Sequence, residues 1–386
     1  MSRGPLEGMK VVEFAGIGPG PMCGMLLADL GAEVLRVDRM VASGLGVARP
    51  RDLDLLNRGK RSVSVDLKAP EGVAFARRLA ACSDALIEGF RPGTMERLGL
   101  GPDACLGAQP RLVYGRVTGF GQSGPLAHAA GHDLNYIALS GALDAIGRAG
   151  APPTPPLNLV GDFGGGGLLL AFGMLAALWR VQRGGEGQVV DAAMVDGAAM
   201  LMTSMFGLLA AGTHNGPRGT NLLDSGAPHY EVYRCADGRY VSIAPIEPKF
   251  RAVLFERLGL ASDEIDCDDP AKWPAAKARL AAVFATRTRA QWCELLEGSD
   301  ACFAPVLSPP EAHLHPHNRE RGTFVEIAGV RQPAPAPRFG GTPSALPRPP
   351  HSDDAAAIEQ LRRWGIAAEE IDGLVAAGRL RAGGPR

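Results

Sequence analysis

The sequence predicts an α/β protein with a doubly wound, Rossmann-like large domain and a smaller α+β domain. Three observations lead to this prediction. The chain opens with alternating strand-like and helix-like segments. From Tyr230 onward, the residue pattern is instead typical of β-hairpins. Its 386 residues also exceed the size at which one hydrophobic core usually stops growing.

The first 120 residues supply the elements of the doubly wound part in order. Apolar residues alternate along the strand-like segments and recur at helical spacing between them. Such β-α-β units make parallel sheets. Strands are predicted at 9–14, 33–37, 61–66, 85–88 and 111–118, and helices at 22–30 and 71–82.

Two long apolar helices follow, at 165–182 and 194–211, with a short strand at 188–190 between them. Their apolar runs, 164–179 and 197–212, are shorter than the eighteen or so residues that a membrane span needs, are rich in glycine and adjoin charged residues. We therefore expect buried helices and no membrane partner.

The large domain is predicted to cover residues 1–220 and the small domain 221–330. In the small domain, segments 230–234 and 240–244 flank the turn Ala236-Asp237-Gly238, which is typical of a hairpin. Helices are expected at 248–258, 273–286 and 289–296. Residues 331–350 are rich in proline and lack acidic residues, so they are expected to form an extended strap. The strap leads into residues 351–386, with helices at 355–364 and 368–377.

Charge and cysteine content exclude several classes of protein. Forty Lys and Arg balance 41 Asp and Glu, which argues against a general nucleic-acid binder. The seven cysteines form no CxxC pair and are odd in number, so we interpret them as reduced thiols. The chain shows no apolar signal core and no peroxisomal tripeptide, and we expect a cytoplasmic location.

The segment Gly16-Ile17-Gly18-Pro19-Gly20-Pro21 imitates a dinucleotide-binding fingerprint, with Asp38 at the end of the second predicted strand. Pro21 stands where the fingerprint has its third glycine. Neither Pro19 nor Pro21 can donate a backbone N–H to a pyrophosphate. We favour a tight structural turn over a nicotinamide site. We likewise interpret His313-Leu314-His315-Pro316-His317 as a polar loop, since no carboxylate or thiol spacing supports a metal there.

Positive charge concentrates in one part of the chain. Residues 36–116 contain 14 Lys and Arg against 9 Asp and Glu, and five of these bases lie within 49–61. A solvated basic face explains this pattern, and so does a site for a polyphosphate such as a nucleotide or coenzyme A. Both interpretations stay open at this point.

His132 and Asp162 are the residues that best fit catalysis. His132 stands in Gly131-His132-Asp133, and Asp162 opens a glycine-rich segment. An imidazole and a carboxylate on opposite sides of one carbon could move its hydrogen from one face to the other. The simpler alternatives are a core histidine and an N-cap for the helix that starts at 165.

Several ordered motifs resemble the class III CoA-transferase family, and within it the alpha-methylacyl-CoA racemase branch. The resemblance runs from about Leu6 to the strap. It rests on Val11-Val12-Glu13-Phe14-Ala15-Gly16, the run 27–34, Asn57-Arg58-Gly59-Lys60-Arg61-Ser62, Gly119-Phe120-Gly121-Gln122-Ser123-Gly124, Gly131-His132-Asp133 and Pro245-Ile246-Glu247-Pro248.

The resemblance implies an acyl-CoA thioester substrate, no metal or redox cofactor, and a homodimer of interlocked chains. It also implies that residues 331–386 return to complete the large domain. His132 and Asp162 would be the acid/base pair, with Glu247 close to His132. The residues implied to hold CoA are Arg39, Val65, Asp66, Leu67, Lys68, Gly89, Phe90, Arg91, Arg97, Gly131, His132, Asp133, Leu134, Asn135 and Tyr136.

Under this resemblance, one residue of the pair removes the hydrogen on carbon 2 of the acyl group, and the planar enolate is reprotonated from the other face. A CoA-transferase on the same fold, with Asp162 as nucleophile, is the competing interpretation, and a noncatalytic acyl-CoA binding module is a third. The four methionines Met194, Met200, Met202 and Met205 suggest buried helix packing or an adaptable apolar acyl surface. Branched fatty acyl, bile-acid-like and arylpropionyl groups remain open as substrates.

Overall fold

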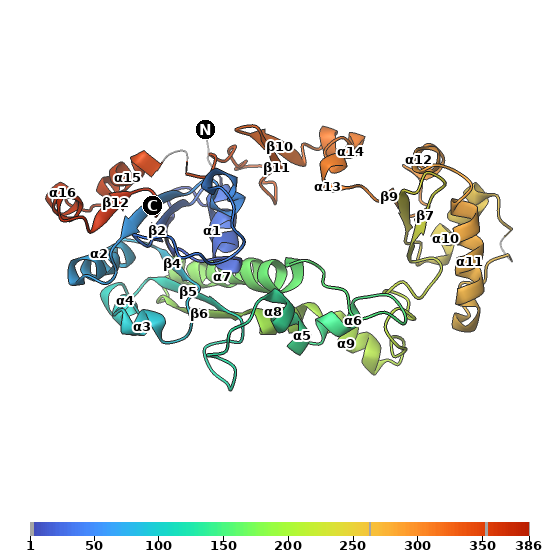
Figure 1. Cartoon of the computed structure of the whole chain (residues 1–386), viewed down its shortest axis with the longest axis horizontal. Coiled ribbons are helices and arrows are strands. Elements are labelled where there is room, and N and C mark those ends of the chain that lie inside the picture. The colour runs from blue at the N-terminus through green and yellow to red at the C-terminus, as the bar shows by residue number, and fades with distance from the viewer. Residues whose placement is uncertain (1–3, 262–263, 352–353, 386) are drawn as a thin grey trace. The chain divides into compact units, whose positions relative to one another are not determined.

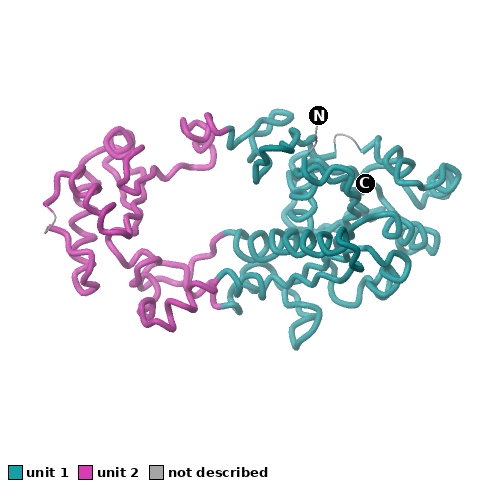
Figure 2. The backbone as a smooth tube through the Cα atoms, turned by 180° about the vertical axis from the view of Figure 1, so that it is seen from behind, with its two compact units in different colours: residues 1–140, 157–201, 322–386 teal, residues 141–156, 202–321 magenta. Residues whose placement is uncertain are grey.

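The computed structural model describes residues 4–261, 264–351 and 354–385. The chain divides into two compact units (Figure 2). The larger contains Met1–Ser140, Leu157–Leu201 and Gly322–Arg386, and the smaller contains Gly141–Pro156 and Met202–Arg321. These bounds differ from the expected 1–220 and 221–330. The helix predicted over 194–211 stops and restarts at Met202, and the chain passes between the units there.

A seven-stranded sheet forms the centre of the larger unit (Figure 1). Its order is β12-β3-β2-β1-β4-β5-β6, and the pairs are parallel except for β12 against β3. The predicted α/β class with a large parallel sheet is therefore confirmed. The strands are β1 (Lys10–Phe14), β2 (Glu33–Asp38), β3 (Arg61–Val65), β4 (Ala85–Glu88), β5 (Val113–Thr118), β6 (Gln188–Ala193) and β12 (Leu380–Ala382).

The connecting helices follow the predicted pattern with one early difference. The first helix begins at Pro19, so the expected turn through residue 21 is partly helical; proline is tolerated at the first helical position because that N–H needs no partner. The helices and 3₁₀ turns up to the fifth strand are α1 (Pro19–Asp29), η1 (Arg51–Leu53), η2 (Leu55–Asn57), α2 (Pro70–Ala81), α3 (Thr94–Arg97) and α4 (Pro102–Ala108). After it come α5 (Asp133–Leu139), η3 (Leu159–Leu168), α7 (Leu169–Gln182) and α8 (Met194–Leu201).

The glycine-rich segment is helical, so the helix begins before the predicted start at residue 165. It forms η3, a π-helix that runs directly into α7, so Asp162 lies in a first helical turn instead of capping one. The glycines allow other segments to come close. A Cβ on Gly197 of α8 would lie 1.9 Å from the carbonyl oxygen of Gly165, and one on Gly167 would lie 2.8 Å from Met22 of α1. The glycines of η3 and α8 thus allow these helices to pack closely together and against α1.

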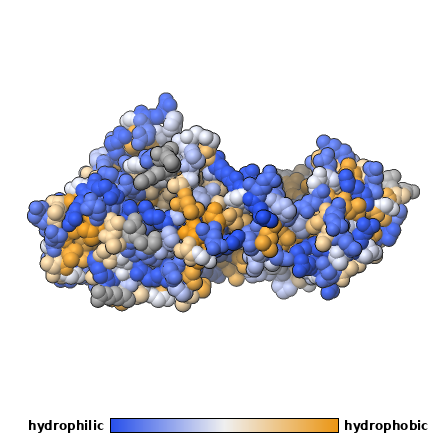
Figure 3. Space-filling view, turned by 90° about the horizontal axis from the view of Figure 1, so that it is seen from above, coloured by the Kyte–Doolittle hydropathy of each residue, from blue (hydrophilic) through white to orange (hydrophobic). Residues whose placement is uncertain are grey.

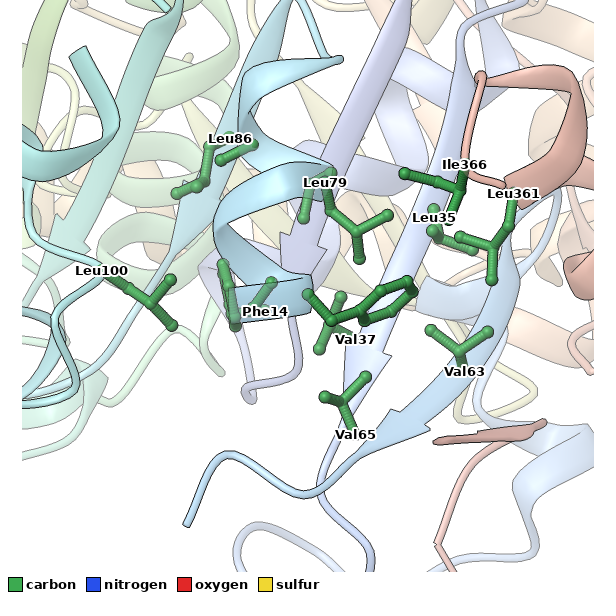
Figure 4. Packing of buried hydrophobic residues seen from close by; sticks show 14 of the residues in the cluster. Phe14, Leu35, Val37, Val63, Val65, Leu79, Leu86, Leu100, Leu361 and Ile366 are labelled. Carbon is green, nitrogen blue, oxygen red and sulfur yellow. The ribbon is translucent and has the colours of Figure 1, made fainter. Parts of the chain in front are cut away.

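One face of the sheet carries a dense apolar core (Figure 4). Phe14, Leu35 and Val63 from three neighbouring strands pack with Leu79 of α2 and with Leu361 near the C-terminus. Each of these side chains is at most 2% exposed. Strands that are covered on both faces have nearly continuous apolar sequences, and these strands could therefore be predicted from the sequence.

The C-terminal segment adds a hairpin, two helices and the edge strand. The strap expected at 331–350 begins inside the hairpin, where Arg58 binds Gln332 and the carbonyl of Pro333 at 2.9 and 2.7 Å. The elements are β10 (Phe324–Ile327), β11 (Val330–Pro333), η5 (Asp354–Ala356), α15 (Ala357–Arg363) and α16 (Ala368–Ala376). The hairpin and β12 were not predicted from sequence.

The smaller unit is a three-stranded antiparallel sheet, β7-β8-β9, packed with helices around its own core. Tyr233 stacks on Phe284, and Phe284 meets Trp292 edge to face. The predicted hairpin and three helices are confirmed. The elements are α6 (Ala142–Ala145), α9 (Thr203–Ala210), β7 (Glu231–Arg234), β8 (Tyr240–Ile243), α10 (Pro248–Leu258), η4 (Pro270–Lys272), α11 (Trp273–Phe284), α12 (Arg289–Leu296), β9 (Phe303–Pro305), α13 (Pro309–Ala312) and α14 (Pro316–Glu320).

One helical stretch of the described chain, Leu159–Gln182, would reach across a membrane by length and composition alone. Core helices pass the same test, and this one packs against α1, β5 and β6. It is weak evidence for a membrane segment.

Candidate active site

A cavity of about 520 Å³ lies at the carboxyl ends of the central strands in the larger unit. Strands β1 and β4 are neighbours, but β1 leads to β2 on one side and β4 leads to β5 on the other. This point is the topological switch of the sheet, where ligands bind in open α/β folds. The cavity is lined by residues that follow these strands, 17–19, 89–92 and 117–120, together with 131–132, Asn135, Tyr136, Asp162 and Met194.

His132 reaches this cavity from the start of α5, where it is the N-cap residue. The side chain of Asn135 accepts a hydrogen bond from the His132 backbone N–H at 3.0 Å, which closes the first turn. The residue is exposed, so its imidazole is accessible to a ligand.

Asp162 lines the same cavity from the first turn of η3. Its carboxylate Oδ2 accepts a hydrogen bond from the Asn158 side chain at 3.3 Å, and its backbone N–H donates to Asp133 Oδ1 at 2.6 Å. A Cβ on Gly18, which follows β1 and has φ 66°, would lie 3.0 Å from Oδ2. The structure thus brings the two predicted catalytic residues to one cavity, with glycine leaving room beside the carboxylate.

The surroundings of Asp162 raise the pKa of its carboxyl group. Burial raises the pKa of its carboxyl above the usual value and the charge of Asp133 raises it further, while the hydrogen bond from Asn158 and the charge of His132 oppose the rise. A carboxyl group with a raised pKa is a stronger base once ionised and exchanges protons more readily near neutral pH.

Tyr136 of α5 lines the same cavity as His132. Its hydroxyl donates to the carbonyl oxygen of Gly131, and its ring meets Phe120 edge to face with ring centres 5.0 Å apart. Burial, with a smaller contribution from Asp162, raises the pKa of Tyr136 to about 12. The phenol is therefore a neutral hydrogen-bonding group that fixes the loop in front of α5.

The residues expected to contact CoA fall into separate groups in the structure. Gly89, Phe90 and Arg91 line the central cavity with Gly131, His132, Asn135 and Tyr136. Leu67, Lys68 and Arg97 line another hollow of about 420 Å³ on the same unit. The Arg39 guanidinium stacks over the Phe90 ring at 5.7 Å, and Leu134 is exposed on α5.

Three residues of this predicted set make contacts within the protein. The side chain of Val65 is 1% exposed and packs in the core, and Asp66 forms an ion pair with Arg379 at 2.5 Å. Asp133 is 6% exposed and binds the backbone of Asp162. The buried side chains of Val65 and Asp133 are not accessible to a ligand, because each serves the packing around it.

The basic cluster at 49–61 is largely used within the protein, which removes most of its support for a polyphosphate site. Lys60 is buried in an ion pair with Glu13 at 2.6 Å, and Arg58 pairs with the buried Asp29 at 2.6 Å. Arg49 pairs with Asp54. A fully buried lysine and a buried arginine also differ from the solvated basic face that was the simpler interpretation.

The four methionines do not form one surface. Met194 lines the central cavity, whereas Met202 and Met205 line a hollow of about 490 Å³ within the smaller unit. In the histidine tract, the His315 imidazole Nε2 lies 2.5 Å from the Glu297 carboxylate. No group of three or more His, Cys, Asp or Glu suited to a metal occurs among the residues that the structure describes.

Glu247 belongs to the smaller unit, where it is the exposed N-cap residue of α10. Its expected proximity to His132 stays a prediction. Sequence reasoning missed Gly18, Asn158 and the role of Asp133. The Asn158–Asp162 contact has the helical i, i+4 spacing and would have been visible had the start of η3 been predicted correctly.

Comparisons with known proteins cover nearly the whole chain. Residues 6–354 match CoA-transferase family III. The chain is 46% identical to alpha-methylacyl-CoA racemase of Mus musculus and 45% to that of Homo sapiens, with 98% of this chain and 99% of each relative covered. A CAIB/BAIF family protein from Brucella suis has a similar structure, with TM-score 0.77 and 28% identity over 93% of this chain and 100% of that chain. The chain belongs to CoA-transferase family III.

Proposed function

We propose that this protein is an isomerase of the alpha-methylacyl-CoA racemase type, which inverts the configuration at carbon 2 of 2-methylacyl-CoA thioesters. The observation that carries the proposal is that His132 and Asp162 line one cavity at the switch point of the sheet. The identity of 45–46% to two racemases over nearly the full length supports it and favours it over CoA transfer.

The chemistry is a proton transfer on a single carbon. The thioester carbonyl acidifies the hydrogen on carbon 2, one residue of the pair removes it, and the other returns a proton to the opposite face of the enolate. His132 and Asp162 exchange the roles of base and acid according to the enantiomer bound. A positioned acid or base supplies about 10²–10⁴ in rate, so the enolate needs stabilisation as well.

Backbone N–H groups of the first turn of η3 are our candidates for stabilising the enolate oxygen, because they lie on the segment that carries Asp162. The N–H of Asp162 itself is already bonded to Asp133. The positive end of the helix dipole adds to the same effect. Each such donor is worth about 10²–10³ in rate by analogy with oxyanion holes.

Glu247 is proposed to hydrogen-bond or orient His132 when substrate is bound. CoA is proposed to be held by the accessible residues of the predicted set, with Gly89–Arg91 and Asn135 at the central cavity and Lys68 and Arg97 at the second hollow. No cofactor is needed, since the thioester itself stabilises the carbanion.

A homodimer is part of the proposal. Phe172 and Trp179 lie seven residues apart on α7, hence on one helix face, and are 70% and 64% exposed. Figure 3 shows apolar patches among hydrophilic residues on the surface. Exposed apolar area of this kind fits an interface between copies. Sedimentation of the purified protein tests the dimer, and cell fractionation tests the proposed cytoplasmic location.

The test of the function is incubation of the protein with a single enantiomer of a 2-methylacyl-CoA in deuterated water. Racemisation predicts deuterium at carbon 2, loss of optical purity and CoA retained on the same acyl group. Movement of CoA to an added free acid through a hydroxylamine-sensitive adduct would instead show a transferase. Tight CoA binding without exchange would show a binding module.

Single variants of the pair sharpen this test. His132→Ala and Asp162→Ala are each expected to lose racemisation, because inversion needs both proton carriers, and each is expected to lose exchange of the enantiomer whose base it lacks. Exchange that survives in both variants would contradict the assignment of the pair.

A further inference from the structure

Asp133 is a buried carboxylate that the proposed proton transfer does not use. It is the first residue of α5, directly after His132, and is 6% exposed. Its Oδ1 accepts the N–H of Asp162 at 2.6 Å, and its Oδ2 is buried with no hydrogen-bond partner in the described part of the chain. A buried carboxylate oxygen without a partner is costly to folding, so this one requires an explanation.

The absence of a side chain at Gly161 leaves room for the contact between Asp133 and the Asp162 N–H. A Cβ on Gly161 would lie 2.6 Å from Asp133 Oδ1 and 3.1 Å from Ile137 of α5. Only glycine lets η3 approach the α5 carboxylate closely enough for the Asp162 N–H to reach it. The contact therefore ties the residue after His132 to the backbone of Asp162.

The charges near Asp162 come from a small number of elements. His132, Asp133 and Tyr136 face it from α5 and its N-cap, and Asn158 contacts it from the start of its own helix. α8 carries Asp196, which is exposed to solvent, and the uncharged Gly18, the N-cap residue of α1, lies beside the Asp162 carboxylate. Asp133 is thus a buried negative charge placed beside a second carboxyl group.

We infer that Asp133 is a positioning residue: by accepting the N–H of Asp162 it fixes that residue at the cavity, and by its buried negative charge it strengthens Asp162 as a base. This inference rests on the proposed acid/base role of Asp162. The same arrangement couples the two proton carriers, because Asp133 follows His132 in the chain and binds Asp162. The effect of the charge agrees in direction with the raised pKa of the Asp162 carboxyl.

The experiment compares Asp133→Asn and Asp133→Ala by deuterium exchange at carbon 2 of a 2-methylacyl-CoA across pH. Asparagine keeps an oxygen that can accept the Asp162 N–H but removes the charge, so the acid limb of the kcat profile is expected to move to lower pH with KM within about twofold of the parent protein. Alanine removes both effects, and kcat is expected to fall by about 10²-fold, the cost of a misplaced catalytic group.

The control is Asp196→Asn, which removes an exposed carboxylate from the helix that packs against η3 and is expected to leave the profile unchanged. An unshifted acid limb in Asp133→Asn would overturn the inference, since a purely structural role would not involve the charge. If Asp133→Asn does not fold, Asp133→Ser provides a smaller neutral acceptor and the same readout. Exchange absent from the parent protein, or racemisation retained in Asp162→Ala, would instead refute the proposed function.

Discussion

Two buried clusters of charge in the larger unit are built in opposite ways. Glu13 of β1 is fully buried and pairs at 2.6 Å with Lys60, which also donates to the carbonyl of Pro21 at 2.9 Å. Asp133 and Asp162 are two carboxyl groups joined through a backbone N–H, and neither forms an ion pair with a lysine or arginine of the described chain. The charges of Glu13 and Lys60 compensate each other, whereas the second cluster joins two carboxyl groups through one backbone N–H.

The difference separates a structural cluster from a functional one. A paired buried charge fixes the position of its neighbours, here the start of α1, but gains no reactivity. Two carboxyl groups with little compensation shift the pKa of at least one of them, which suits a group that must exchange a proton. Removal of charge should therefore harm stability in the first cluster and activity in the second.

The largest effect is expected from Asp162→Asn. Deuterium exchange at carbon 2 should fall by about 10²–10⁴-fold, because the amide cannot carry the proton. The free energy of unfolding should fall little, because a half-buried carboxyl group that lacks an ion pair is removed. Exchange kinetics and urea unfolding of the same preparation measure both quantities. A loss of stability as large as that from breaking the Glu13–Lys60 pair would contradict the division into a structural and a functional cluster.

Lys60→Met should show the reverse pattern. It leaves the Glu13 carboxylate buried without its partner, and the free energy of unfolding should drop by about 3–5 kcal/mol. The double variant Glu13→Leu with Lys60→Met removes both charges and should recover most of that loss. Urea unfolding of the two single variants and the double variant measures the coupling. Additive losses would mean that the pair does not act as a unit.

A smaller effect is expected from Gly197→Ala, which tests the packing that holds Asp162 in place. The new Cβ would lie 1.9 Å from the carbonyl oxygen of Gly165, and such overpacking costs about 1–3 kcal/mol. Gly207→Ala on α9 is the matched control, because a Cβ there meets nothing within 4 Å. It should stabilise by up to about 1 kcal/mol through helix propensity. Equal effects of the two changes in thermal unfolding would argue against close helix packing at η3.

Sequence reasoning located the regular parts of this fold because local preference and tertiary packing agree there. The bounds of α10 and α12 match the prediction, and the buried strands were found from their apolar runs. It failed at η3, where glycine disfavours a helix by about 1 kcal/mol per residue and only close packing against α1 and α8 compensates. The edge strand β12 is three residues long and exists through its pairing with β3.

The candidate site was predicted correctly only where local sequence motifs mark its residues. His132 and Asp162 are recognisable from their own motifs, and the structure places both at one cavity. The resemblance implied that Asp133 contacts CoA, as part of the segment 131–136. Its actual contact is 29 residues away, through a backbone N–H that no sequence pattern reports.

The smallest effect is expected from Asn158→Ala, which acts on Asp162 in the opposite direction to the loss of the Asp133 charge. The hydrogen bond from Asn158 opposes the rise in the pKa of the Asp162 carboxyl, so its removal should raise that pKa further. Asp162 acts as a base only when ionised, so the acid limb of the exchange profile should move to higher pH, while Asp133→Asn should move it lower. Asn158 is exposed and makes no capping bond for η3, so stability should change little. Profiles that move in the same direction in both variants would show that the two neighbours do not set the basicity of Asp162 through charge and hydrogen bonding.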